Sequence, residues 1–62
     1  MTSFIVAEVR WNALILSETE RPKLQRFVFR HKWRGALTPE VGMPVVGETD
    51  RWGNPTFVQP AP

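Results

Sequence analysis

Residues 24–34 read Leu24-Gln25-Arg26-Phe27-Val28-Phe29-Arg30-His31-Lys32-Trp33-Arg34. Rings and cations alternate through this stretch, which is the period-2 pattern of a half-buried β-strand. We expect Leu24–Lys32 to form a strand with an aromatic face and a basic face, the basic face also containing Val28. Two arrangements fit this pattern: the rings form core and the cations meet solvent, or the rings form a platform presented to a ligand.

Four further segments have the apolar content and the flanking turn residues of short strands. They are Phe4–Trp11, Leu14–Thr19, Met43–Glu48 and Thr56–Gln59. In the first of them, partial alternation predicts an apolar side made of Ile5, Ala7, Val9 and Trp11. A helix over residues 4–18 is disfavoured, because β-branched and aromatic residues dominate its first half and no N-cap residue opens it.

Proline and glycine mark the connections between these strands. The expected loops and turns are residues 20–23, 35–42 and 50–55. Within the second of these, Thr38 and Pro39 favour a single helical turn, since threonine caps helices and proline suits the first helical position. Residues 60–62 are expected to form a frayed tail, which leaves residues 1–59 as one domain.

Five short strands at regular spacing predict an all-β protein, namely a small five-stranded antiparallel barrel. An SH3-like barrel is one arrangement of such strands, and an oligonucleotide-binding barrel is another. With 62 residues, folding buries only about 60% of the surface that the unfolded chain exposes. The chain has no cysteine, so no disulfide can supplement this small core.

The residue types that catalysis and metal binding require are scarce in this sequence. A structural zinc site needs about four ligands, whereas the chain offers no cysteine and one histidine, His31. His31 is also the only imidazole that could activate a serine or threonine nucleophile. The glycines do not form a phosphate-binding loop between a strand and a helix. We therefore expect a protein that is not an enzyme and that holds no metal or cofactor.

Hydrophobic patterning gives no membrane or export signal. The longest apolar run, Ala13–Leu16, is far shorter than the roughly 20 residues that cross a bilayer. The first residues lack the charged start and long apolar stretch of a signal peptide. The sequence therefore predicts a cytoplasmic protein without a membrane partner.

Positive charge is concentrated in one part of the chain. The formal net charge is only +2, yet six of the eight basic residues lie between Arg21 and Arg34. No acidic residue occurs between Glu20 and Glu40. Such asymmetry is typical of proteins with a polyanionic partner, although a solvated basic strand has the same composition.

Aromatic residues are interleaved with these cations, and the same pairing recurs at Arg10-Trp11 and Arg51-Trp52. Proteins that bind single-stranded nucleic acid combine a basic track with rings on which bases stack. Trp33 and Trp52 lie near predicted turns and are expected to be exposed, whereas Phe27 and Phe29 are expected in the core if Val28 faces outward. The candidate nucleic-acid-binding residues are Arg10, Trp11, Arg26, Phe29, Arg30, His31, Lys32, Trp33, Arg34, Arg51 and Trp52.

The order of these segments resembles a cold-shock domain, the five-stranded oligonucleotide-binding barrel of single-stranded RNA and DNA binders. Three segments carry the likeness: Val9–Asn12, Phe27–His31, and Gly42–Val45 followed by Arg51–Val58. They are similar to the basic-tryptophan first strand, the Val-Phe-Val-His third strand and the closing hairpin of that family. The resemblance implies stacking roles for Trp11, Phe29 and His31 and a phosphate contact for Arg10.

Two other functions fit the same composition. Tryptophan and arginine also dominate protein interfaces, so the chain could be a small regulator or inhibitor that docks on a larger enzyme. A homo-oligomer could instead bury the same tryptophans to compensate for the small core. The concentration of positive charge favours nucleic acid over a protein partner.

Overall fold

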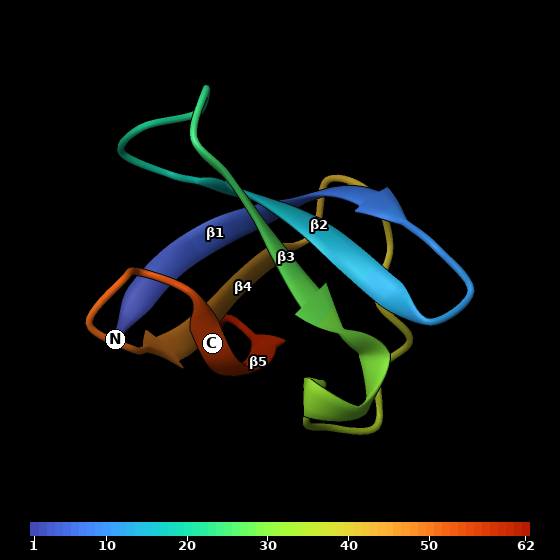
Figure 1. Cartoon of the computed structure of the whole chain (residues 1–62). Helices are drawn as coiled ribbons and strands as arrows, with labels where there is room; N and C mark the ends of the chain where they lie inside the picture. Colours follow the sequence, from blue (N-terminus) through green and yellow to red (C-terminus); the bar gives the residue numbers. More distant parts are fainter.

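Five antiparallel strands form one strongly curled sheet in the computed structural model of the chain, which describes residues 1–62 (Figure 1). The strands are β1 (Thr2–Val9), β2 (Ala13–Glu18), β3 (Gln25–Phe29), β4 (Pro44–Thr49) and β5 (Pro55–Pro60), and a 3-10 turn, η1 (Arg30–Lys32), follows β3. This arrangement confirms the predicted all-β class with five short antiparallel strands. None of the elements is a helix long and apolar enough to cross a bilayer.

The strand order in the sheet is β3-β2-β1-β4-β5, so β3 and β5 are its two edges. Curling brings these edges toward each other, and the result is a half-barrel with a seam between β3 and β5 (Figure 1). The seam is joined beyond the end of β3, where Trp33 forms a parallel bridge with Val58. There the backbone N–H of Arg34 donates to the carbonyl oxygen of Val58 at 2.8 Å.

The core lies on the concave side of the curl. Its buried side chains are Phe4, Val6, Leu14, Leu16, Val28, Val45 and Val58, with Trp33 and Met43 packed partly against them. Each fully buried side chain of this kind stabilises the fold by roughly 1.5–3 kcal/mol. Because Val28 faces this core, its neighbours on β3 must face outward.

The predicted buried side of the first strand is wrong. Phe4 and Val6 are buried, whereas Ile5 and Val9 are partly exposed and Trp11 lies beyond the strand. The register between β1 and β2 shifts between Val6 and Glu8, which is the mark of a β-bulge. A bulge adds one residue to one strand, so a single alternation cannot describe the whole of β1.

The predicted third strand is too long, because regular pairing stops at Phe29. The N–H of Arg30 donates to the carbonyl oxygen of Asn12, and the N–H of Trp33 donates to that of Arg30, which closes the 3-10 turn. Alternation therefore does not set the direction of side chains after residue 29. The predicted helical turn at Thr38–Pro39 is also wrong, since residues 38–40 have no regular structure.

The last strand extends past the predicted boundary at residue 59. Pro60 pairs with Val45, and the N–H of Ala61 donates to the carbonyl oxygen of Pro44 at 3.0 Å. The sheet therefore includes most of the segment that composition marked as a tail.

Candidate nucleic-acid interface

Two phenylalanine rings lie on the convex, outer face of the sheet formed by β2 and β3. Phe27 is 46% exposed and Phe29 is 49% exposed, because Val28 between them is buried in the core. Their partners on β2 are Ile15, which is partly buried, and Ala13, which is buried. Of the two arrangements that the alternating pattern allowed, the one with the rings in the core is therefore wrong.

The rings continue in a row past the end of β3. Phe27 and Phe29 meet edge to face, with 5.0 Å between centroids and an interplanar angle of 88°. The His31 ring stacks on Phe29 at 5.8 Å and 16°. We call Phe27, Phe29 and His31 the ring row. Edge-to-face and offset-stacked contacts are the favourable geometries for such rings, so the row is held in a defined shape.

Phe27 is a member of this row that the candidate set from the sequence did not include. The signal was present, since Phe27 and Phe29 share one parity on one strand and must face the same way. What was missing was the direction of Val28, which only the packing of the whole sheet decides.

Trp11 lies in the loop between β1 and β2 and is 90% exposed. This loop is attached to the end of β3, because the carbonyl oxygen of Asn12 accepts the N–H of Arg30 at 2.8 Å. Trp11 therefore stands at the end of the sheet where Phe29 and His31 lie. The neighbouring Arg10 is exposed and forms an ion pair with Glu8, with Nε 3.0 Å from Oε1.

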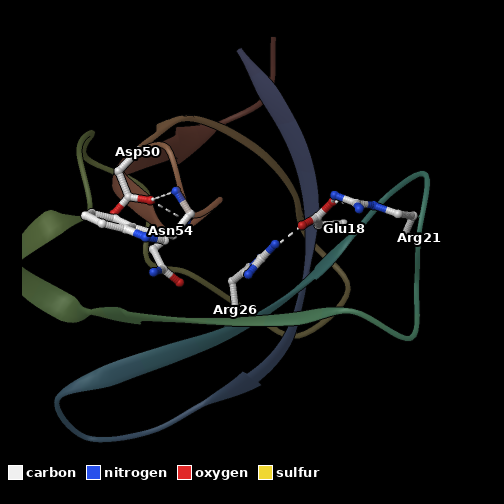
Figure 2. Close-up of polar contacts among 6 residues, drawn as sticks. Glu18, Arg21, Arg26, Asp50 and Asn54 are labelled. Carbon is white, nitrogen blue, oxygen red and sulfur yellow. Dashed lines mark hydrogen bonds and ion pairs between the residues drawn. The ribbon is translucent and has the colours of Figure 1, made fainter.

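Trp52 is presented by the β4–β5 turn, residues 50–54, and is 67% exposed. The Oδ1 oxygen of Asp50 accepts the N–H groups of both Trp52 and Asn54 at 2.9 Å. Figure 2 shows Asp50 and Asn54 side by side in this turn. Gly53 has φ +85°, a conformation that glycine adopts without strain. The Arg51 guanidinium lies 4.7 Å from the Trp52 ring centre, so the turn presents a ring and a cation together.

Several cations near these rings form no ion pair. They are Arg30 and Lys32 on η1, Arg34 after it, and Arg51 on the β4–β5 turn. Arg34 lies over the Phe57 ring, 3.9 Å from its centre. Cations without a carboxylate partner are free to neutralise an external anion.

Arg26 lies apart from this set. It points toward the concave side, its side chain is 18% exposed, and its Nε donates to Oε2 of Glu18 at 2.9 Å. Glu18 also accepts two hydrogen bonds from Arg21, at 2.6 and 3.1 Å. Hydrogen bonding to Arg21, assisted by Arg26, holds the pKa of the Glu18 carboxyl below its usual range, although desolvation acts in the opposite direction.

Trp33 is also placed differently from the exposed position that the sequence predicted. It is half-buried against the core, and its indole Nε1–H donates to the carbonyl oxygen of Leu37 at 2.8 Å. After the 3-10 turn that follows β3, this residue lies at the seam, where it bridges Val58 in the parallel sense. The exposed rings are therefore Trp11, Phe27, Phe29, His31 and Trp52.

The exposed rings lie on the outer face of β3, on the turn that follows it, and in the β1–β2 and β4–β5 loops. Comparison of the chain with models of known families, with curated protein sequences and with solved structures gives no match.

Proposed function

We propose that this protein binds single-stranded nucleic acid with little sequence preference, through the exposed rings around β3. The observation that carries the proposal is the ring row, in which Phe27, Phe29 and His31 present aromatic surface to solvent from β3 and the turn that follows it. Every base has a π-face, so stacking on such rings tolerates sequence and contributes about 1–3 kcal/mol per base.

The position of the rings in the fold supports the same function. Oligonucleotide-binding barrels use the face of strands 2 and 3 together with the loops that join strands 1 to 2 and 4 to 5. In this protein the β2–β3 face carries the ring row, the first of these loops carries Trp11, and the second carries Trp52. The resemblance to a cold-shock domain, with Trp11, Phe29 and His31 as its stacking residues, belongs to this proposal.

Positive charge would supply the remaining affinity. Arg30, Lys32, Arg34 and Arg51 have no carboxylate partner and can each neutralise a phosphate. Single-strand binding weakens with salt by a slope of about −0.7 per neutralised phosphate, so four contacts give about −3 in log K against log salt. Arg10 can contribute only by leaving its exposed pair with Glu8.

Fluorescence titration with a short single-stranded oligothymidylate tests the proposal. Quenching of tryptophan emission is expected to saturate at low salt and to weaken as salt is raised. A duplex of equal length is the control, since its bases are paired and cannot stack on the rings. Absence of binding to the single strand even at low salt would contradict the proposed function.

A small protein partner is the second candidate, and one observation favours it. Trp52 with its stacked Arg51, and the highly exposed Trp11, have the composition of protein-interface hot spots. If the titration shows no oligonucleotide binding, the favoured function becomes that of a regulator or inhibitor that docks on a larger protein.

A further inference from the structure

Arg26 occupies a place that no other cation of this protein has. It extends from β3 toward the concave side and joins three parts of the chain: its own strand, Glu18 at the end of β2, and the β4–β5 turn (Figure 2). A Cβ atom added to Gly53 would lie 2.5 Å from Nη2 of Arg26, so the backbone of this turn lies directly against the guanidinium.

We propose that the Glu18–Arg26 ion pair attaches the β4–β5 turn to β3 and thereby positions Trp52 for nucleic-acid binding. Arg26 is then a positioning residue and not a phosphate contact. The inference rests on the proposed function for its role in binding, and on geometry within the free protein for the attachment itself.

The sheet topology gives the β4–β5 turn no backbone pairing with β3. The strands that flank the turn, β4 and β5, lie at the opposite end of the sheet order from β3. The backbone bridge between the two edges, Trp33 to Val58, lies beyond the end of β3, and no ladder pairs β3 with β5. Near residue 26, the seam is therefore spanned by the Arg26 side chain.

Electrostatics explain why the guanidinium stays there. Glu18 is nearly buried and keeps its charge because Arg21 and Arg26 both donate to it. Arg26 is likewise mostly buried, and leaving Glu18 to reach a phosphate would remove one of the partners of that carboxylate. Breaking a buried pair by removing one partner is unfavourable, so Arg26 is held in place.

The position of Trp52 depends on the turn because Trp52 directly precedes Gly53, which lies against Arg26. Gly53 is favoured by its positive φ, and the absence of a side chain there lets the Arg26 guanidinium lie against the backbone of the turn. The preceding residue is Trp52, whose N–H is held by Asp50 Oδ1. With the turn closed by Asp50 at one end and resting on Arg26 at Gly53, little freedom remains for the backbone that carries the indole.

Arg26 could contact phosphate or position Trp52, and replacement of Glu18 by glutamine should change the affinity for oligothymidylate in opposite directions in the two cases. If Arg26 contacts phosphate, Glu18→Gln removes a competing negative charge, so oligothymidylate should bind more tightly. If Arg26 positions Trp52, the same change should weaken binding, by at most the loss caused by Trp52→Ala, which is about 5- to 150-fold. Glu20→Gln is the matched control, because it makes the same charge change at an exposed residue outside any ion pair.

A double-mutant cycle with Trp52→Ala makes the test specific. Positioning predicts that Glu18→Gln weakens binding in the wild-type background and has no such effect when Trp52 is already alanine. Tighter binding in both backgrounds, or equal weakening in both, would overturn the inference. Arg26→Met gives a second variant in which Glu18 keeps Arg21 as its partner. It should weaken binding without changing the salt slope, whereas loss of a phosphate contact lowers the slope by about 0.7.

The attachment can also be measured without any ligand. Heteronuclear NOE values of the Trp52 and Gly53 amides should match those of the strands in the wild type and fall in Glu18→Gln, with strand amides unchanged. Unchanged values for the turn would overturn the inference. If the wild type binds no oligonucleotide but the NOE values behave as expected, the proposed function fails while the attachment stands.

Discussion

Replacing Phe29 by alanine should weaken oligonucleotide binding strongly, whereas Val28→Ala should lower stability to a similar extent and leave binding nearly unchanged. The two residues are neighbours on β3 and face opposite sides of the sheet. Phe29 is half-exposed in the ring row, whereas Val28 is buried in the core. Substitutions at these two adjacent positions therefore test the outer face and the core of the sheet separately.

The expected losses of stability are similar for the two variants. Full burial of a phenylalanine is worth roughly 1.5–3 kcal/mol, and because Phe29 is 49% exposed its removal should cost about half of that. Its edge-to-face contact with Phe27 adds about 0.5–1.5 kcal/mol. Val28→Ala deletes two buried methyl groups and should cost about 1–3 kcal/mol.

The expected losses of binding are very different. Phe29→Ala removes one stacking ring and should raise the dissociation constant for oligothymidylate by about 5- to 150-fold. The buried Val28 side chain touches no ligand, so Val28→Ala should leave the dissociation constant nearly unchanged. Urea denaturation measures the free energy of unfolding, and fluorescence titration measures the dissociation constant. Both are carried out at about 10 °C, near the usual temperature of maximum stability. Equal weakening by two variants that are both folded would refute the assignment of the outer face.

Three further results are expected. Gly47→Ala should lower the free energy of unfolding by about 1–3 kcal/mol in urea denaturation, because an added Cβ would collide with the carbonyl oxygen of Phe57 on the paired strand, and an unchanged midpoint would contradict the register of β4 and β5. Lys32→Ala should reduce the salt slope of oligothymidylate binding by about 0.7, and an unchanged slope would show that this residue meets no phosphate. Since the pKa of Glu18 is lowered in the folded state, its contribution to stability is present above the ordinary glutamate pKa and is lost as pH falls through the folded-state value. Glu18→Gln should therefore flatten the acid limb of a stability profile measured by thermal unfolding, and an unchanged acid limb would contradict this contribution of Glu18.

Alternation and turn residues were sufficient to predict five strands and their order along the chain, because each strand carries its own pattern. They were insufficient in β1, where Phe4, Ile5 and Val6 offer apolar residues of both parities and a bulge changes the register. In β3, the packing of the whole sheet decides whether Val28 or its neighbours face the core, so the strand's own sequence could not predict the orientation of its side chains.

The candidate site was predicted in part for the same reason. Trp52 lies in a turn, and the turn residues around it correctly predicted its exposure. Trp11 was predicted on the apolar side of the first strand, but it lies exposed in the loop that follows β1. Trp33 and Arg26 were assigned from their cationic and aromatic neighbours, but their positions are set by long-range contacts, the first with the core at the seam and the second with Glu18. The partner of Arg26 is eight residues away on another strand, and nothing in local composition indicates such a pair.

The seam also bears on how molecules of this protein behave toward one another. An open sheet edge is a template on which another chain can add a strand, and this leads to aggregation. Here the two edges of one sheet face each other, and β5 begins and ends with proline, which has no N–H to offer. Because the sheet curls, its two edge strands, β3 and β5, face each other across the seam. Cations follow β3 at the end where the Trp33–Val58 bridge closes the seam. A sheet this small can thus leave its aromatic face open to a ligand while its edges remain poor sites for self-association.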